Sequence, residues 1–390
     1  MQNEKKIKTL AVIGAGEGAM PILKRATQLD YVRTLVFGMT DSIARDLADE
    51  FVTADYHDVD TITDICRSHH VDGVMASSEN TTEVTAIIAH RLRLPGNDIT
   101  GGFAARNKYL MRCRVGKITT IRQPRYTLYS EGTDYQYPVV VKALDSCAKR
   151  GIKIAYSQSD MDEAVAYARQ YSSDGRVLVE EYIEGGTEYS IECLAGNGLH
   201  EVIQITEYES YGPPHFVETA HHQPAKLSLD LKEKIVKGAT DVLKVLGINY
   251  GMAHMEVKVV NGEVYFIEVG ARAAGGHLAD ILLPASTDFD YFKEAIDCCL
   301  GQYVHKDVHN VAFSGIFFRC SKNAHMKPLF DMAKAGAPWC ISYVENTEDF
   351  PEATDGEHCV GTGHFAYCMD HKMTMEFIQE LKDKEQKRLK

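Results

Sequence analysis

The stretch from Tyr250 to Gly270 constrains the fold more than any other part of the chain. It reads YGMAHMEVKVVNGEVYFIEVG, two apolar runs separated by Asn261 and Gly262. An Asn-Gly pair between two such runs is a strong short-range signal for a β-hairpin, because both residues tolerate the positive φ angles of the tight turn. The sequence therefore predicts two long antiparallel strands in this region.

Two carboxylates lie within these strands. Strand alternation places Glu256 on one face with His254 and Lys258, and it places Glu268 on one face with Gly270. An unpaired carboxylate inside an apolar strand is costly, so both glutamates need a cationic partner. Two carboxylates presented across a hairpin suit Mg²⁺ or Mn²⁺ shared with nucleotide phosphates. We therefore predict a metal site at Glu256 and Glu268.

A loop of small residues, ARAAGGH, follows the hairpin. A guanidinium group can hold phosphoryl oxygens through two parallel hydrogen bonds, which makes Arg272 a candidate phosphate ligand. Gly275 and Gly276 allow the backbone to approach a ligand closely. The loop is therefore predicted to form part of the reaction site.

The first hundred residues alternate apolar strands with amphipathic helices. The expected strands are TLAVIGAG, TLVFGMT, VTADYH and VDGVMASS, and the expected helices are GAMPILKRATQLD, SIARDLADEF, TITDICRSHH and TTEVTAIIAHRLRL. Alternating strands and helices predict a small, doubly wound parallel sheet. The turn Gly14–Gly18 opens the first helix, but Ala19 replaces the third glycine of a dinucleotide fingerprint. This favours a tight corner or one wall of a substrate site over NAD binding.

Two lysines are candidate phosphate ligands. Lys142 ends the apolar strand YPVVV, and the polar loop LDSCAKRGI, which contains Ser146 and Gly151, leads into a second strand, KIAYS. A lysine and a small-residue loop between two strands can cover a triphosphate. Lys108 begins a helix after a Gly-Gly turn and is the second candidate.

The segment RVLVEEYIEGGTEYSIEC is a candidate nucleoside site. Its buried strand ends in Glu180 and Glu181, continues to Ile183, and turns through two glycines to Glu188. Adenine needs backbone donors and acceptors beside an apolar slot, and a ribose needs a carboxylate for its hydroxyls. Residues 180–183 and Glu188 can supply these groups.

Taken in order, these features resemble the ATP-grasp superfamily from about residue 100 to about residue 300. The resemblance implies an α/β protein with α+β lobes: an N-terminal pre-ATP-grasp domain (1–100), an ATP-grasp domain (101–305, lid about 118–185) and a C-terminal lobe (306–390). It further implies ATP phosphates at Lys108 and Lys142 under a loop at Ser146 and Gly151, and an acyl phosphate at Arg272. The other implied sites are adenine at Glu180, Glu181 and Ile183, ribose at Glu188, and Mg²⁺ at Glu256 and Glu268.

Two positions depart from the family pattern. Gly270 stands where the family often has an asparagine as third metal ligand, and the loop SCAKR is poorer in glycine than the usual phosphate cover. The segments PPHFVETAHHQPAKLS and EVGARAAGGH resemble amino-acid ligases within the superfamily. This implies an ADP-forming carboxylate–amine ligase acting through an acyl phosphate. Candidate substrate residues are Glu218, His221, His222, His254, Gly275 and Gly276.

Other functions remain as alternatives: a purine-pathway ATP-grasp ligase or carboxylase acting on a ribose phosphate, a dehydrogenase, and a non-catalytic nucleotide sensor. The net charge of −13 argues against a nucleic-acid partner, and no apolar run reaches the roughly 20 residues of a membrane span. Ten cysteines without a C-x-x-C pair indicate reduced, cytoplasmic usage, and Cys359, His364, Cys368 and His371 match no standard zinc spacing. The partners expected are a small carboxylic acid and an amine, with a homodimer as one possible assembly.

Overall fold

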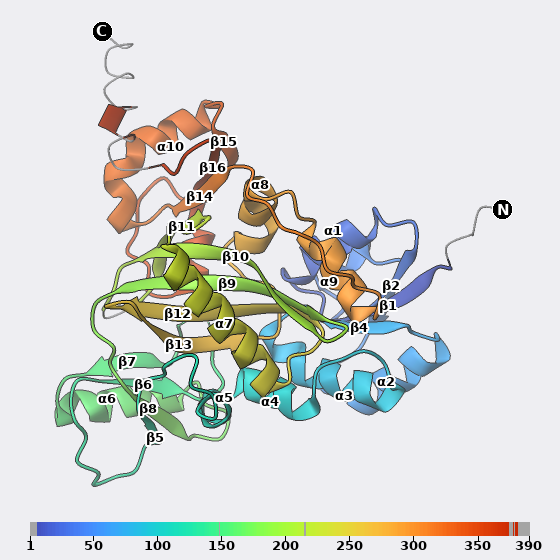
Figure 1. Ribbon diagram of the computed structural model, residues 1–390, viewed down its shortest axis with the longest axis horizontal. Coiled ribbons are helices and arrows are strands. Elements are labelled where there is room, and N and C mark those ends of the chain that lie inside the picture. The colour runs from blue at the N-terminus through green and yellow to red at the C-terminus, as the bar shows by residue number, and fades with distance from the viewer. Residues whose placement is uncertain (1–5, 148, 214–215, 374–376, 378, 381–390) are drawn as a thin grey trace.

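The computed structural model describes residues 6–147, 149–213, 216–373, 377 and 379–380. Within these residues the strands form three sheets: a parallel four-stranded sheet, a mainly antiparallel eight-stranded sheet and a second four-stranded sheet. Figure 1 shows the eight-stranded sheet in the middle of the molecule. The charged stretch from Thr374 onward, which the sequence favours as a closing helix, falls almost entirely outside the described residues. The predicted mixed α/β class is confirmed.

The N-terminal sheet has the order β3-β2-β1-β4 with parallel pairing throughout. The first strand pairs with β2 on one side and β4 on the other, which is the doubly wound arrangement predicted. Its strands are β1 (Lys8–Ile13), β2 (Val32–Gly38), β3 (Glu50–Thr53) and β4 (Gly73–Ala76), and its helices are α1 (Ala19–Ala26), α2 (Val59–Ser68) and α3 (Thr82–Leu92).

The helix expected over residues 42–51 is wrong. Only a short 3₁₀ turn forms there, at Arg45–Leu47, and β3 begins at Glu50, earlier than expected. The carboxylate of Asp49 accepts hydrogen bonds from the backbone N and the hydroxyl of Thr34, at 2.8 and 2.9 Å. These contacts hold the chain against β2, so strand pairing replaces the local helical preference.

The stretch FAARNKYLMRCRV, from which a helix is expected to begin, spans two helices in the structure. The structure has α4 (Ile99–Arg106) and α5 (Lys108–Val115), separated by Asn107 in an extended conformation. The side chain of Asn107 accepts a hydrogen bond from the backbone N of Leu110 at 3.0 Å and so caps α5. The break places Lys108 in the first turn of α5.

A small antiparallel sheet of order β5-β8-β6-β7 lies within the residues predicted to form the lid, and we refer to it as the lid. Its pairing of β6 with β7 and β8 agrees with the strands predicted around Lys142. Helix α6 packs on this sheet, and its N-cap Ser157 accepts a hydrogen bond from the backbone N of Asp160. The elements are β5 (Tyr126–Leu128), β6 (Val139–Ala143), β7 (Ile152–Ala155), α6 (Gln158–Arg169) and β8 (Val177–Glu181).

The central sheet has the order β13-β12-β9-β10-β11-β14-β16-β15. The predicted hairpin is confirmed: β12 and β13 pair across Asn261 and Gly262, whose φ angles are 52° and 77°. The strands are β9 (Thr187–Gly196), β10 (Leu199–Ser210), β11 (Glu218–Gln223), β12 (Gly251–Val260), β13 (Glu263–Gly270), β14 (Phe313–Phe318), β15 (Cys340–Glu345) and β16 (Gly363–Met369). The last three strands continue the same sheet past the predicted boundary at residue 305, and that boundary stays a prediction.

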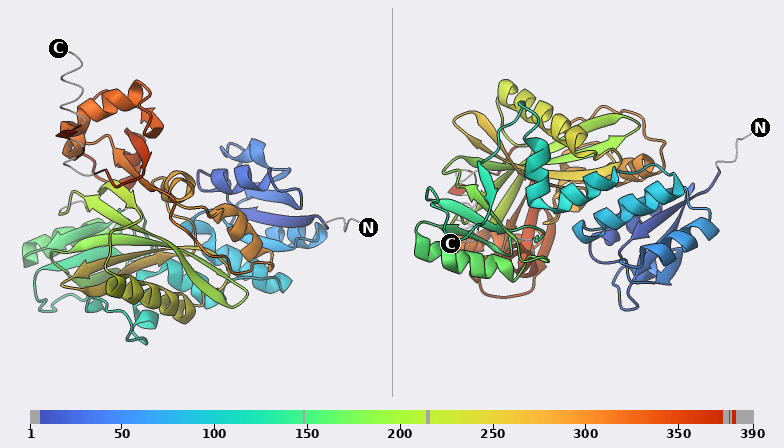
Figure 2. Two further views of the ribbon diagram at one scale, coloured as in Figure 1. Left: turned by 45° about the horizontal axis from the view of Figure 1, so that its top comes forward. Right: turned by 90° about the horizontal axis from the view of Figure 1, so that it is seen from below.

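Helix α7 (Leu229–Leu246) lies across one face of the central sheet (Figure 1). Its Ile235, Val242 and Leu243 are fully buried in an apolar cluster with the sheet. The remaining helices are a π-helix (Leu278–Leu282), α8 (Leu283–Ser286), α9 (Tyr291–Cys299), α10 (Lys327–Lys334), α11 (Gly356–Gly361) and 3₁₀ turns at Glu79–Thr81 and Ser321–Met326. Figure 2 shows the lid and the N-terminal sheet at opposite ends of the central sheet. No helix in the described part of the chain is both long and apolar enough to cross a bilayer.

Candidate active site

A cleft of about 750 Å³ lies between the lid and the central sheet. Seven of the predicted site residues line it: Lys142, Glu180, Glu181, Ile183, Glu188, Glu256 and Glu268. The other lining residues are Pro124, Val140, Lys149, Ile152, Tyr182, Tyr189, Tyr208, Phe216, Val257, Lys258 and Ile267.

The two hairpin glutamates face each other in this cleft. Glu256 on β12 is the direct register partner of Glu268 on β13, so both carboxylates lie on one face, as the strand alternation predicts. Burial raises the pKa of Glu268, but Lys108 together with Lys149 and Lys142 more than offsets it and lowers that pKa. Burial also opposes ionisation of Glu256, and Lys149 and His254 lower its pKa. Both glutamates are therefore charged near neutral pH.

Lys149 is a cleft residue that the sequence did not single out. It lies in the β6–β7 loop, and its Nζ is 3.0 Å from Glu218 Oε1 on β11 and 3.0 Å from Glu256 Oε2. Burial disfavours a charged ammonium here, but the surrounding carboxylates raise the pKa of Lys149 well above its usual value. Nothing in the local pattern SCAKRGI distinguishes this lysine from a surface charge, because its partners come from distant strands.

Lys142 is held by a buried charge cluster. Its Nζ is 2.6 Å from Glu180 Oε2, and Arg112 Nε of α5 donates to Glu180 Oε1 at 2.5 Å. Burial raises the pKa of Glu180, but Arg112 and Lys142 more than offset it and lower that pKa to about 2. The Glu180 carboxylate is thus paired with two cations. An adenine beside this strand would therefore contact the backbone of Glu180 and not its side chain.

Replacing Arg112 with Met is expected to lower the free energy of unfolding by about 3–5 kcal/mol, because Glu180 would lose one of two counter-charges in a buried site. The neighbouring pair Arg125–Glu181 provides the control on the same strand. Its side chains are 73% and 36% exposed, against 2% for both partners of Arg112–Glu180. Arg125→Met should cost at most about 1 kcal/mol. Equal losses in denaturant unfolding would contradict the assignment of Arg112 as the structural cation.

Lys108 connects the lid loop to the hairpin. Its backbone N donates to Leu144 O at 2.8 Å, its Nζ donates to Ser146 O at 2.7 Å, and the same Nζ is 3.3 Å from Glu268 Oε2. Lys108 and Ser146 therefore lie beside the cleft, close to the hairpin carboxylates. Gly151 has φ of 70°, and a Cβ there would come within 2.9 Å of the Ala143 Cβ, so this turn requires glycine.

An apolar slot with a carboxylate at its end occupies the β8–β9 side of the cleft. Tyr182 and Ile183 follow β8, and Tyr182 lies beside Phe216 with ring centroids 6.2 Å apart. Glu188 lies 3.6 Å from Lys258 Nζ. These residues match the positions that the sequence proposed for adenine and ribose, and these two roles stay predictions.

Arg272 follows β13 in the chain and lies on the side of the hairpin that faces the N-terminal sheet. Its Nη2 is 3.1 Å from Glu79 Oε2, directly after β4, and its Nη1 donates to Ala273 O at 2.9 Å. The turn at Gly18 packs closely on Ser77, since a Cβ at Gly18 would come within 2.1 Å of Ser77 O. Arg272 therefore faces the carboxyl ends of β1 and β4, where strand order reverses and open α/β sheets bind ligands.

The predicted substrate residues fall into two groups. His254 Nδ1 is 2.7 Å from Glu192 Oε1; burial disfavours the imidazolium, but Glu192 more than compensates and raises the pKa of His254 to about 9. His221 is buried under Gly276, between the rings of Tyr208 and Phe318, and burial lowers its pKa to about 3. His254 lies beside the hairpin carboxylates, whereas His221 and the glycine loop do not line the cleft.

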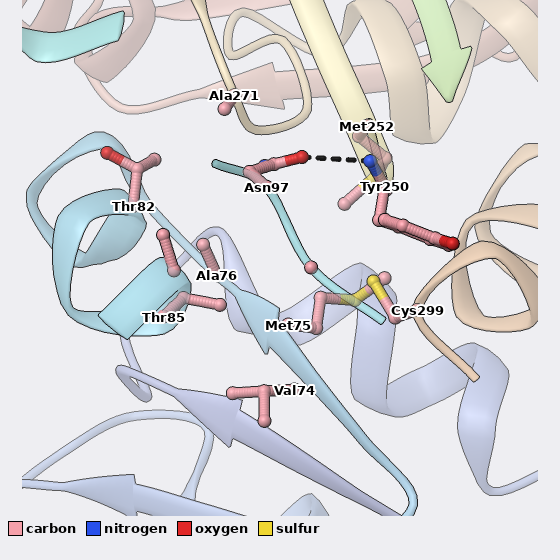
Figure 3. Close-up of a pocket in the computed structure, with 13 residues that line it drawn as sticks. Val74, Met75, Ala76, Thr82, Thr85, Asn97, Tyr250, Met252, Ala271 and Cys299 are labelled. Atoms are coloured by element: carbon pink, nitrogen blue, oxygen red, sulfur yellow. Dashed lines mark hydrogen bonds between the residues drawn. The ribbon is translucent and has the colours of Figure 1, made fainter. Parts of the chain in front are cut away.

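A second, smaller cavity lies where β4 and α3 meet β12 (Figure 3). Asn97 closes one side, with its Oδ1 accepting from the backbone N of Tyr250 at 2.8 Å. Its lining includes Val74, Met252 and Cys299 and carries no Lys, Arg, His, Asp or Glu. A cavity without charged side chains does not suit a triphosphate, so the larger cleft is the candidate site for a phosphate-bearing ligand.

The donor set of the cleft fits a divalent cation that nucleotide phosphates help to hold. In the described ranges, no three His, Cys, Asp or Glu side chains lie close enough together to hold a metal by themselves. Glu256 and Glu268 supply two hard oxygen donors, and Mg²⁺ commonly takes one or two carboxylates together with phosphate oxygens and water.

The cleft brings two carboxylates and several lysines together under the lid. This arrangement is typical of proteins that bind a nucleotide and transfer its phosphoryl group. Residues 135–280 match the family model described as the ATP-grasp domain. The L-amino acid ligase from Bacillus licheniformis shares the fold at 20% identity, with a TM-score of 0.77 over 97% of this chain and 98% of that chain. Residues 135–280 of this protein therefore form an ATP-grasp domain.

Two curated relatives are similar in sequence. The formate-dependent phosphoribosylglycinamide formyltransferase of Sulfolobus acidocaldarius is 26% identical over 317 residues, which cover 75% of this chain and 76% of the relative. Dapdiamide A synthase of Enterobacter agglomerans is 25% identical over 234 residues, covering 56% of this chain and 54% of the relative. The match therefore spans about half the length of the synthase.

Proposed function

We propose that this protein is an ADP-forming, ATP-dependent carboxylate–amine ligase that makes an amide bond through an acyl phosphate. The observation that carries the proposal is the pairing of Glu256 with Glu268 across the hairpin, with Lys142 lining the same cleft. The fold shared with an L-amino acid ligase and the similarity to dapdiamide A synthase support it.

ATP would lie in the cleft with its adenine in the slot at Tyr182 and Ile183 and its ribose at Glu188. Lys108 and Lys142 would contact the phosphates, since both ammonium groups lie at or beside the cleft. Mg²⁺ held by Glu256 and Glu268 would neutralise charge on the phosphoryl oxygens.

The reaction has two steps. An oxygen of the substrate carboxylate attacks the γ-phosphorus, the bond to the β-phosphate oxygen breaks, and ADP leaves. The amine nitrogen then attacks the acyl carbon, loses a proton, and expels phosphate. Lys142 and Arg272 stabilise the charge that develops in these steps, and the lid excludes water that would hydrolyse the acyl phosphate.

The crevice at the ends of β1 and β4 favours an amine substrate. Its two segments, Gly14–Gly18 and Ser77–Glu79, contain Glu17 and Glu79. Glu79 pairs with Arg272 at 3.1 Å, so Glu17 is the carboxylate of these segments that lies outside this ion pair. Carboxylates attract an ammonium group and repel a phosphate. We therefore propose a small carboxylic acid and an amine, such as an amino acid, as the substrates.

The alternative is a ligase acting on a ribose phosphate. The similarity to the Sulfolobus formyltransferase over three quarters of both chains favours it. Glu17 in the crevice is the feature that counts against it, and the identity of the accepted amine separates the two functions.

We expect ATP to be cleaved to ADP and phosphate when the correct acid and amine are present. A lid over the phosphates and a metal hairpin suit transfer of the γ-phosphoryl group. Pairs of amino acids and small acids should be screened for phosphate release, with mass spectrometry of the products and chromatography of the spent nucleotide. AMP as the main nucleotide product would refute the proposed reaction.

A further inference from the structure

The β6–β7 loop of the lid reaches the central sheet through Lys149. Its ammonium lies between Glu218 Oε1 and Glu256 Oε2, 3.0 Å from each, and all three side chains are largely buried. Glu218 starts β11 and Glu256 lies on β12, so one lysine joins the lid to two strands that are not neighbours. Lys149 thus contacts one of the two carboxylates proposed to hold the metal.

The backbone at Lys149 is unusual for this residue type. Its φ of 61° lies in the left-handed region that favours glycine, and Gly151, two residues on, has φ of 70°. A non-glycine residue in this region carries a modest backbone cost, and such residues cluster at functional sites. A glycine would remove the backbone cost of the positive φ angle at this position. We therefore take the ammonium group of Lys149 to be the feature that matters there.

The charges around Lys149 show what the ammonium offsets. Glu218 and Glu256 repel one another: burial and the charge of Glu256 raise the pKa of Glu218. Glu268 and Glu188 add further negative potential at Lys149. Several buried carboxylates need a counter-charge, which either an ammonium or a divalent cation can supply.

We propose that Lys149 is the resident counter-cation of this carboxylate group and exchanges with the metal when the metal–nucleotide complex binds. The proposal rests on the proposed function, in which Glu256 and Glu268 hold the metal. The ammonium and a divalent cation compete for Glu256, so the metal alone binds weakly. A nucleotide removes the competition, because its phosphates give Lys149 a new anionic partner. Lys149 is therefore a positioning residue that makes metal binding depend on the nucleotide and links that binding to the lid.

The test measures Mn²⁺ binding by calorimetry and by the electron paramagnetic resonance signal of free Mn²⁺, with and without ADP. Lys149→Met removes the charge at similar length and should raise the affinity for Mn²⁺ alone by about 10-fold or more, within the usual range of coupling between sites. The factor by which ADP strengthens Mn²⁺ binding should fall to the same extent. Lys149→Arg keeps the charge and should retain both values of the wild type.

Lys153→Met is the matched control, since Lys153 is an exposed lysine of the same lid and contacts the Tyr167 ring. It should leave both values unchanged. If Lys149 formed a purely structural ion pair, Lys149→Met would alter thermal stability but would not change the factor by which ADP strengthens Mn²⁺ binding. If Lys149→Met fails to fold, Lys149→Gln is measured instead, because its amide still donates hydrogen bonds to both carboxylates without the charge.

Unchanged Mn²⁺ affinity in the neutral variants, or equal changes in Lys153→Met, would overturn the exchange proposal. Glu268→Gln separates this failure from failure of the proposed function. If Glu268→Gln weakens Mn²⁺ binding in the presence of ADP while Lys149→Met has no effect, the metal site stands and the exchange is wrong. If Glu268→Gln binds Mn²⁺–ADP as the wild type does, the metal site itself is wrong.

Discussion

Glu268→Gln is expected to lower turnover by at least about 10²–10³-fold, the scale for losing one preorganised charge-stabilising group, while the protein stays folded. Glu268 faces Glu256 across the hairpin, and its Oε2 lies 3.3 Å from Lys108 Nζ. The amide keeps the shape of the side chain but removes half of the negative charge offered to the metal. A neutral oxygen also binds a hard cation more weakly than a carboxylate.

The measurement is steady-state turnover across a Mg²⁺ titration, with circular dichroism to check the fold. Glu263→Gln is the control on the same strand, because Glu263 forms an exposed ion pair with Arg122 away from the cleft. It should keep wild-type turnover. Near-normal turnover of Glu268→Gln at saturating Mg²⁺ would show that Glu268 is not a metal ligand.

Arg272→Lys is expected to lower turnover by roughly 10²-fold with little change in ATP affinity. Lysine keeps the positive charge beside Glu79 but loses the planar fork that can hold two oxygens of an acyl phosphate. The guanidinium lies on the side of the hairpin that faces the N-terminal sheet. Arg272 is not among the residues that line the large cleft. Its contribution should therefore appear after the nucleotide has bound.

Nucleotide binding by calorimetry and turnover should be measured on the same preparations. Hydroxylamine should trap an acyl hydroxamate from the wild type when the correct acid is supplied without amine. A variant that binds ATP poorly yet turns over normally at saturation would make Arg272 a nucleotide ligand only. Absence of hydroxamate with the acid that supports turnover would contradict the acyl-phosphate route.

The prediction from sequence was most accurate where local signals and tertiary structure agree. The Asn261–Gly262 turn sets the register of β12 and β13, and that register brings Glu256 opposite Glu268. The helix expected over residues 42–51 failed because the hydrogen bonds of Asp49 to Thr34 depend on a distant strand. Periodicity describes only neighbours along the chain, so it cannot detect such contacts.

The cationic residues of the site also divide into those that the sequence identified and those that only the structure revealed. Lys108 and Lys142 were identifiable because each begins or ends a predicted element. Arg112 and Lys149 were missed: Arg112 appears as an ordinary helical residue, yet it is buried against Glu180, 68 positions away along the chain. A residue whose partners lie on other lobes carries no local signal.

The sequence by itself determined the parallel N-terminal sheet, the antiparallel hairpin and the residue types that we propose to hold phosphate and metal. Alternating apolar residues and turn residues act over a few positions, so these elements can be recognised from the sequence alone. Only the tertiary structure decided which charges meet. The Glu180 carboxylate turns to Arg112 and Lys142, Arg272 faces Glu79, and Lys149 crosses from the lid to Glu218 and Glu256. The physical reason is that a buried charge must find an opposite charge, and in this fold that partner lies on another lobe or a distant strand.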